Sequence, residues 1–303
     1  MPQTPHAQHF HAELTIPQSA LQTLSELQVF SNSELKRLAQ QGAVWVSRFD
    51  EQHLRHRKPE RLRRLKTPLK IGDRLDLYYH PQANQPCDRT PHLIADYQDY
   101  SIWLKPRGTF SQGSKYGDAC TLYRWAEVQT SRPCWIVHRL DRATHGLMLL
   151  AHNKKSVQVL TALFEQRQIE KRYQANVHGH LEQPLKINAP IDERHALSHI
   201  LPQKRFMHNE APCTRVEVRI ETGRKHQIRK HLHSVGHPII GDRLYGDHEL
   251  DLRTFQALDL QLTASFLRFE CPFSREIREF ELAENQLDLL APTAAPSLNS
   301  DSV

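Results

Sequence analysis

Short apolar stretches separated by turn residues dominate the chain from about residue 93 onward. One clear helical period lies among them: along Lys154–Gln166, apolar side chains recur on a single helix face. The other apolar stretches have the length of β-strands. They are Trp135–Val137, Leu147–Ala151, Tyr173–Val177, Thr214–Ile220 and Phe266–Phe269. The pattern predicts a mixed α+β body over residues 93–288.

A different order of elements precedes this body, over residues 21–80. Ser33 is placed to cap a helix over Glu34–Gln41, and a glycine follows the helix. Strands are predicted at Ala43–Val46 and, beyond a Gly-Asp turn, at Arg74–Tyr79. These elements predict a small, separately folded α/β module.

The order of elements in this module resembles that of an S4-type RNA-binding module, whose helix pair presents basic side chains to RNA. The resemblance rests on the segments LKRLAQQGAVWV and LKIGDRLDL. The alternative interpretation is a solvated helix face followed by an unrelated hairpin.

Three further segments lack a regular apolar period. Residues 1–20 are polar, and residues 81–92 contain three prolines, which indicates a linker. Residues 289–303 are small and polar, as is typical of a disordered tail. No internal repeat is apparent.

The sequence also limits the compartment. The longest purely apolar run, Leu147–Ala151, is far shorter than the roughly 20 residues of a membrane helix. The first residues show neither the basic nor the apolar region of a signal peptide. Five widely spaced cysteines without a CxxC pair favour reduced thiols over a disulfide framework. We therefore expect a cytoplasmic protein with no membrane partner.

Charge is concentrated in one place. The chain has 40 basic and 34 acidic residues, a formal net charge of +6. The whole excess lies in residues 53–66, so a uniformly basic, histone-like coat is excluded and one cationic patch is predicted. The alternative is a merely solubilising face. The basic residues of this run are Arg55, Arg57, Lys58, Arg61, Arg63, Arg64 and Lys66.

Two segments carry candidate chemistry, and the first is IVHRLDRATHGLMLLA, residues 136–151. Its polar loop places Asp141 between Arg139 and Arg142. A carboxylate beside a guanidinium stays ionised, and an ionised aspartate can act as a nucleophile, accept protons or bind a metal. Taken alone, such a loop is more often a structural Arg–Asp turn than a catalytic one, because such turns are common.

The second segment is ETGRKHQIRKHLHSVGHPIIGDRLYG, residues 221–246. A helix is predicted over Lys225–Leu232, and four histidines lie within twelve residues. The histidines invite a metal site, and a metal-dependent nuclease is one hypothesis. Their spacing opposes it, because no histidine pair has the acidic companion of an HExxH site and no cysteine lies close. We expect no metal.

Four segments together resemble one family. HRLDRATHGLMLLA is similar to the catalytic motif of the RluA-type RNA pseudouridine synthases, and the segment 221–246 is similar to their second long motif. LKPRG at residues 104–108 and KRYQANVHG at residues 171–179 resemble two further motifs, in the family's order. The resemblance covers about residues 95–270. It implies a mixed, mainly antiparallel sheet and an isomerase that needs no cofactor.

The resemblance also implies roles for individual residues. Asp141 matches the catalytic aspartate, Tyr173 the active-site tyrosine that stacks on uracil, and Arg229 the arginine that pairs with the catalytic carboxylate. Whether Asp141 attacks C1′ of the ribose or abstracts a proton to form a glycal stays open. The residues implied at the base pocket are Arg139, Arg142 and Ile228.

An RNA partner follows from this resemblance. The target uridine must leave its stack, which costs a few kcal/mol, and Arg142 would fill the gap that it leaves. The basic run 53–66 would bind phosphates of structured RNA. We expect a monomeric enzyme that acts on 23S rRNA. The alternatives are a tRNA-directed pseudouridine synthase and a non-catalytic RNA-binding or ribosome-assembly factor.

The chain departs from the family pattern at several positions. The family usually has Ser at His145 and Thr at Lys225, and Thr263 and Cys271 replace two histidines near the end. FSQGS, which follows LKPRG, is also a poor match. These departures leave the target RNA open.

Overall fold

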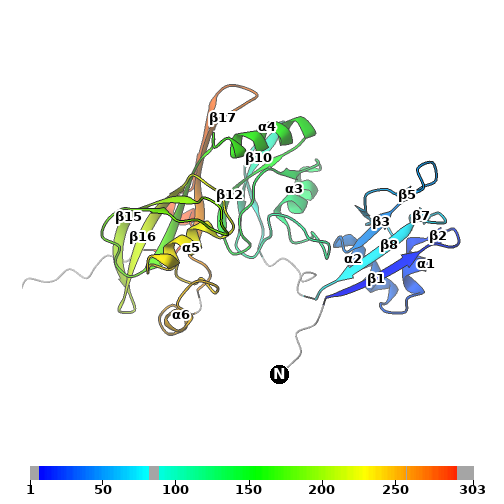
Figure 1. Cartoon of the computed structure of the whole chain (residues 1–303), viewed down its shortest axis with the longest axis horizontal. Helices are drawn as coiled ribbons and strands as arrows, with labels where there is room; N and C mark the ends of the chain where they lie inside the picture. Colours follow the sequence, from blue (N-terminus) through cyan, green and yellow to red (C-terminus); the bar gives the residue numbers. More distant parts are fainter. Residues whose placement is uncertain (1–6, 82–88, 257, 292–303) are drawn as a thin grey trace, which may run out of the picture. The chain divides into compact units, whose positions relative to one another are not determined.

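The computed structural model describes residues 7–81, 89–256 and 258–291. The chain divides into two compact units (Figure 1). The first combines Met1–Asp88 with Phe110–Arg132, and the second combines Arg89–Thr109 with Pro133–Val303. This division differs from the predicted one, in which residues 110–132 belong to the 93–288 body. Most of the predicted linker, residues 82–88, lies outside the described residues.

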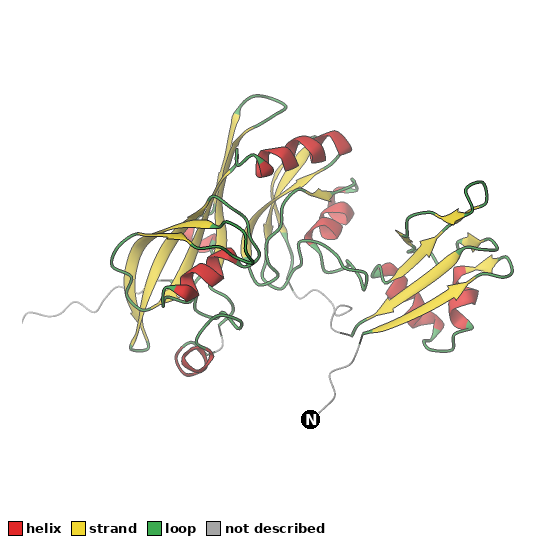
Figure 2. Cartoon of the chain, viewed as in Figure 1, coloured by secondary structure: helices red, strands yellow, loops and turns green. Residues whose placement is uncertain are grey.

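The first unit contains a four-stranded antiparallel sheet, in the order β1-β8-β3-β6, and the two short helices α1 and α2. Figure 2 colours strands yellow and helices red. The segment 110–132 adds a third helix. The elements are β1 (Gln8–Glu13), β2 (Gln18–Ser19), α1 (Ala20–Ser25), α2 (Asn32–Gln40), β3 (Val44–Ser47), β4 (Phe49–Asp50), β5 (Arg55–His56), β6 (Glu60–Arg61), β7 (Pro68–Leu69), β8 (Arg74–Tyr79) and α3 (Leu122–Thr130).

Two predictions for this unit change in detail. The N-cap of α2 is Ser31 rather than Ser33, because the Ser31 side chain accepts the hydrogen bond from the Glu34 amide. Residues 1–20 include β1, which pairs with the whole of β8. The sequence of β1 is polar because β1 is an edge strand, and only its Phe10 packs on the core. For this reason no strand was predicted there. The predicted strand over Arg74–Tyr79 has the bounds of β8.

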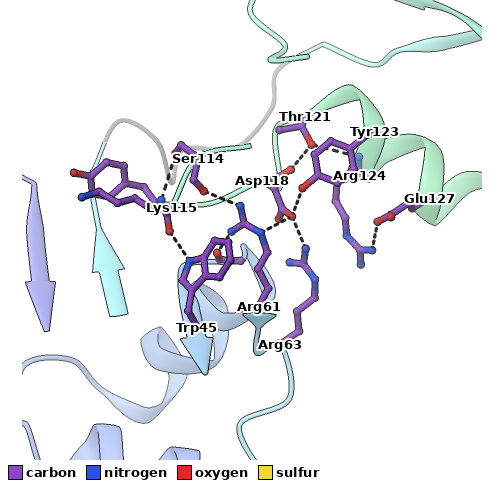
Figure 3. A network of polar contacts seen from close by, with 12 residues as sticks. Trp45, Arg61, Arg63, Ser114, Lys115, Asp118, Thr121, Tyr123, Arg124 and Glu127 are labelled. Carbon is purple, nitrogen blue, oxygen red and sulfur yellow. Dashed lines mark hydrogen bonds and ion pairs between the residues drawn. The ribbon is translucent and has the colours of Figure 1, made fainter. Parts of the chain in front are cut away.

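The basic run 53–66 forms strands and loops rather than a helix, and part of it is internal. Asp118, which is almost fully buried, accepts hydrogen bonds from Arg63 Nη2 and Tyr123 Oη, both at 2.6 Å (Figure 3). Arg61 Nε lies 3.1 Å from the same carboxylate oxygen. This Asp118 cluster fastens the segment 110–132 to the N-terminal sheet.

Neighbouring contacts complete the Asp118 cluster. The Arg61 guanidinium lies 4.3 Å from the Trp45 ring centre and donates to the carbonyls of Gly42 and Ser114. The Trp45 indole donates to the Lys115 carbonyl at 2.9 Å (Figure 3). Gly42 must be glycine here, because its φ is +82° and a Cβ would lie 2.5 Å from Asp118. Arg61 is therefore held within the fold.

Replacing the carboxylate of this cluster should destabilise the first unit. We expect Asp118→Asn to lower its free energy of unfolding by about 3 kcal/mol, because two guanidinium groups lose their shared anion. Urea unfolding followed by tryptophan fluorescence measures the change. Glu60→Gln, at an exposed acid of the same run, is the control and should have little effect. Equal stability of the two variants would contradict the structural role of Asp118.

The second unit is a ten-stranded sheet whose main path is β14-β15-β16-β13-β17-β12-β10-β9. Every pair is antiparallel except β12 with β17, so the predicted mixed, mainly antiparallel α+β class is confirmed. The elements are β9 (His92–Asp96), β10 (Tyr100–Lys105), β11 (Trp135–Ile136), β12 (His145–Ala151), α4 (Lys154–Glu165), β13 (Glu170–His178), β14 (Leu185–Asn188), β15 (Leu197–His208), β16 (Ala211–Ile220), α5 (Gln227–Ser234), α6 (His248–Thr254), β17 (Leu262–Glu270), β18 (Ile277–Glu281) and the 3₁₀ helix η1 (Glu284–Gln286).

Three apolar clusters pack on this sheet, and two of them adjoin the segments that carry the predicted site. One contains Leu160 of α4 with residues of β10, β12 and β17, and the other contains Ile228 and Leu232 of α5 with residues of β13 and β16. Gly146 lets β12 approach β17, because a Cβ there would lie 2.3 Å from the Ala264 carbonyl oxygen. The two halves of the sheet therefore meet at the strand that follows the Asp141 loop.

The segment after β18 is bound to the sheet. His145 and Thr263, two of the departures from the family pattern, are register partners on β12 and β17. His145 Nε2 lies 3.0 Å from the Gln286 carbonyl, and Thr263 Oγ1 donates to the Leu287 carbonyl at 2.5 Å. Leu290, placed in the predicted disordered tail, donates its amide hydrogen to Gln261 at 2.6 Å. Residues 292–303 lie outside the described residues.

The buried His145 predicts a pH dependence of stability. Burial lowers its pKa to about 4, against about 6.5 for an exposed histidine. Between these values the unfolded chain binds the additional proton, so this contribution to stability is present above about pH 6.5 and is lost as the pH falls toward 4. We expect His145→Gln to remove up to about 3 kcal/mol of this dependence.

Urea unfolding from pH 4 to pH 7 measures that change. His248→Gln is the control, because the His248 side chain is exposed, and it should leave the wild-type dependence intact. If the free energy of unfolding of His145→Gln varied with pH in parallel with that of the wild type, the lowered pKa of His145 would not be the source of the dependence.

The cysteines follow the prediction in part. Cys134, Cys213 and Cys271 are free and buried. Cys120 is disulfide-bonded, so the prediction of reduced thiols is wrong at that position. Cys87 lies outside the described residues. In the described ranges, no helix is both long and apolar enough to cross a membrane.

Candidate active site

A cavity of about 200 Å³ in the second unit brings several predicted site residues together. It lies at the start of α5, beside β13 and the loop before β12. Its walls include the apolar side chains Leu140, Ile220 and Leu262. The predicted residues that line it are Asp141, Tyr173, Arg229, Ile228 and Arg139.

Asp141 lies on the loop between β11 and β12. The Thr144 amide donates to the Asp141 carbonyl at 3.1 Å, which closes a turn. One carboxylate oxygen, Oδ2, lies 3.6 Å from Arg229 Nη1 and 3.7 Å from His226 Nε2. Asp141 thus presents a partly exposed carboxylate to the cavity, with a positive charge beside it.

Asp242, which was not among the site residues predicted from the sequence, holds Arg229 in this position. The carboxylate of Asp242 accepts from Arg229 Nε at 2.7 Å and from Nη2 at 2.6 Å, so Nη1 is left to face Asp141. It also accepts from the amides of Leu244 and Tyr245. Burial would raise the pKa of Asp242, but these hydrogen bonds outweigh it and hold the pKa below its ordinary value.

Gln227 fixes the start of α5. Its side-chain amide donates to the Leu197 carbonyl at 2.9 Å and to Ser198 Oγ at 3.0 Å, while its oxygen accepts from Thr222 at 2.7 Å. The adjacent His226 is in the left-handed region, with φ of 56°. These contacts determine where Ile228 and Arg229 enter the cavity.

Tyr173 lies on β13 at the wall of the same cavity. Burial, followed by the negative charge of Asp141, raises its pKa above the ordinary value of a tyrosine. The side chain is therefore a neutral phenol at neutral pH. It presents a flat ring and an uncharged hydroxyl to whatever occupies the cavity.

Lys105 stabilises the Asp141 loop through its side chain, and it was not among the site residues predicted from the sequence. The side chain is fully buried, and Nζ donates to the carbonyls of Thr109 at 2.9 Å and Arg142 at 3.4 Å. Burial lowers the pKa of Lys105 to about 7, although the charge of Asp141 opposes this shift. The Gly108 amide also donates to the Arg142 carbonyl at 2.9 Å, which ties LKPRG to the loop.

Comparisons with known proteins agree on one family. A family model described as RNA pseudouridylate synthase matches residues 99–234. An RNA pseudouridine synthase from Aquifex aeolicus is 31% identical over 289 residues, which cover 84% of this chain and 86% of the relative. The dual-specificity RNA pseudouridine synthase RluA of Vibrio parahaemolyticus is 35% identical over 216 residues, covering 65% and 84%. The chain belongs to the RluA family of RNA pseudouridine synthases.

Other similarities support this assignment. Ribosomal large subunit pseudouridine synthase D of Buchnera aphidicola is 31% identical over 224 residues, which cover 64% of this chain and 71% of the relative. The solved structure of human RNA pseudouridylate synthase domain containing 1 has the same fold, with a TM-score of 0.56 and 22% identity over 66% of this chain and 86% of that one. The enzyme is an RNA pseudouridine synthase, an isomerase.

The remaining predicted residues lie elsewhere on the enzyme. Arg142 is exposed and outside the cavity lining, with Nε donating to the Gly108 carbonyl at 3.1 Å. In the basic run, Arg61 and Arg63 belong to the Asp118 cluster, so their guanidinium groups already have partners. The exposed members of the run are Arg55, Arg57, Lys58, Arg64 and Lys66.

The histidines of the second motif point to different partners. His231 contacts Ser198 Oγ and the Ala189 carbonyl, and His237 contacts the His178 carbonyl. Across the described residues, no three His, Cys, Asp or Glu side chains gather as metal ligands. These contacts assign His231 and His237 to packing of the synthase fold.

Proposed function

We propose that this pseudouridine synthase isomerises uridine in 23S rRNA, with Asp141 as the reacting carboxylate. The observation that carries the proposal is the Asp141 carboxylate in a cavity with a positive charge 3.6 Å away and Tyr173 in the wall. The choice of RNA is supported by relatives named ribosomal large subunit pseudouridine synthases C and D.

The reaction breaks one bond and forms another without a change of oxidation state. The N1–C1′ glycosidic bond of uridine is cleaved, the detached uracil rotates, and C5 joins C1′ while the C5 proton leaves and N1 takes up a proton. Asp141 either bonds to C1′ or removes a proton from the sugar, and both routes use the same carboxylate. Arg229 stabilises that carboxylate when it is free and charged.

The cavity walls suit a detached base. Tyr173, a neutral phenol, provides a flat ring for stacking, and Ile228 covers the base on the α5 side. A volume of about 200 Å³ is below the usual size of a drug-binding pocket, and it suits one flipped base whose ribose lies at the Asp141 carboxylate. In this proposal Arg142, an exposed residue of the Asp141 loop, would occupy the gap in the RNA stack.

The first unit provides a second RNA contact in this proposal. Its helix pair and following sheet are consistent with an S4-like module. Four exposed cations of residues 53–66, Arg55, Lys58, Arg64 and Lys66, are available for phosphates, whereas Arg61 and Arg63 pair with Asp118 and Arg57 pairs with Asp50. We therefore expect only these four exposed cations of residues 53–66, and not the whole basic run, to contact RNA.

Unmodified transcripts distinguish the targets. The purified enzyme is incubated with 23S rRNA and, separately, with a pool of tRNA transcripts, and pseudouridine is mapped in both. We expect modification of discrete uridines in 23S rRNA alone. Modification confined to tRNA would overturn the choice of RNA. Modification of both would indicate dual specificity, which the name of the Vibrio parahaemolyticus relative describes for that protein.

A further inference from the structure

A second hollow adjoins the Asp141 cavity. It has a volume of about 400 Å³, and it shares part of its wall with the cavity. We call it the Lys171 hollow, after the lysine at the start of β13 that lines it. The residues common to both are Arg139, Tyr173, Ile220, Gly223 and Arg224. A nucleotide next to the one in the cavity would therefore lie close to the hollow.

The Lys171 hollow is cationic. Arg139, Arg167, Lys171 and Arg224 line it, against two carboxylates. One of these carboxylates, Glu221, already has a hydrogen bond with His199 at 2.9 Å. The hollow thus has an excess of positive charge, with four cations against two carboxylates.

Its cations are only partly neutralised by the protein, because Glu221 lies within electrostatic reach of Arg167 but has His199 as its hydrogen-bond partner. In the described part of the chain, Arg139 and Arg167 form no hydrogen bond or ion pair through their side chains, and Lys171 has no acidic partner. Burial lowers the pKa of Lys171, and the positive charge of Arg167 lowers it further. Two like charges held together without a directly bonded carboxylate form a site that a further anion would stabilise.

The positions of these groups are fixed by the fold. Arg167 has a φ of 60° in the turn after α4, and Lys171 follows at the start of β13. Lys171 Nζ lies 5.7 Å from the centre of the Phe164 ring, which stacks on His138 at 4.2 Å. His138 in turn accepts from the Leu149 amide at 2.9 Å. The hollow is therefore anchored to the strand that carries the Asp141 loop.

We propose that the Lys171 hollow binds the RNA backbone phosphates next to the target uridine, through Arg167 and Lys171. The occupant is a phosphodiester chain because the hollow is cationic and shares a wall with the cavity that takes the uridine. This proposal rests on the pseudouridine synthase activity but not on the choice of 23S rRNA. It assigns RNA contact to the second unit as well as to the first.

Charge-removing variants test the proposal. We expect the double variant Arg167→Gln/Lys171→Gln to raise KM for RNA about tenfold at unchanged kcat. The slope of log affinity against log salt should become shallower by about 1.4, the loss expected for two phosphate contacts on a single strand. Lys171→Arg keeps the charge and should keep the slope. The matched control is Lys154→Gln/Lys155→Gln, which removes two exposed charges of α4 outside the hollow.

Two RNA probes separate this proposal from the proposed target. Binding is measured with 23S rRNA transcript and with a short oligouridylate, from low to high KCl. A wild-type slope for the double variant on both probes would overturn the phosphate site. If the wild-type enzyme leaves 23S rRNA unmodified but the double variant still shows a shallower slope on oligouridylate, the target fails while the phosphate site stands.

Discussion

Asp141→Asn is expected to lower the rate of pseudouridine formation more than about a thousandfold, while RNA binding is retained. The amide is nearly the same size as the carboxylate, but it can neither bond to C1′ nor take a proton. Release of tritium from RNA that carries 5-tritiated uridine measures the rate, since the C5 proton leaves in the product. A gel-shift titration measures binding.

Asp192→Asn is the matched control for that experiment. Asp192 is an exposed aspartate that forms an ion pair with Lys230 of α5 at 2.9 Å, near the site but outside the cavity. An exposed pair contributes about 0–1 kcal/mol, so its loss should leave turnover unchanged. Equal, small losses in the two variants would show that Asp141 does not react with the substrate.

Asp242→Asn is the second change with a large expected effect. The buried Asp242 binds Arg229 through two hydrogen bonds, and the asparagine would turn a donor toward one of them. We expect a loss of about 3 kcal/mol in the free energy of unfolding, because a buried guanidinium loses its anion. Turnover should fall about a hundredfold, because Nη1 of Arg229 no longer holds its place beside Asp141.

Two readouts separate positioning from instability. Single-turnover kinetics under conditions where the variant is fully folded should show a lower rate of the chemical step at nearly unchanged RNA affinity. Asp251→Asn is the comparison variant. Asp251 is also buried, and its Oδ1 lies 2.9 Å from His178 Nε2, but it is not part of the cavity wall. A stability loss in Asp242→Asn without a kinetic loss would assign Asp242 to folding alone.

The candidate site was predictable to the extent that its residues lie within recognisable motifs. HRLDR contains Asp141 and HQIR contains Arg229, and the structure places both on one cavity. Asp242 was missed although GDRLYG contains it. A signal was present: an arginine held against a catalytic carboxylate needs a second anion to fix its orientation, and that segment supplies one. The buried state of Lys105 could not be read from LKPRG, because burial depends on strands far away in the sequence.

The basic run shows why composition alone misassigns residues. Arg61, Arg63 and Arg64 are equivalent in the sequence, yet two of them bind Asp118, which lies 55 residues from Arg63, and the third is exposed. A charge excess in the sequence shows where cations are concentrated. It does not show which of them form ion pairs inside the fold. The segment 110–132 has no motif that assigns it to the first unit.

Regular elements were predictable where the apolar period was strong. The helix over Lys154–Gln166 corresponds to α4, and its end differs by one residue. The long strand β15, with Pro202 and exposed polar residues, was not predicted, since it mixes buried and exposed positions without alternation. Tertiary pairing with β16 overrides the weak local pattern there.

The central claim is that Asp141 of this enzyme converts uridine to pseudouridine in 23S rRNA. Mapping of pseudouridine in total RNA of a deletion strain, complemented with the wild type or with Asp141→Asn, tests it most directly. The account predicts that one or more 23S rRNA sites disappear on deletion, return with the wild type and stay absent with Asp141→Asn. Restoration of those sites by Asp141→Asn, or a 23S rRNA map unchanged by the deletion, would contradict it.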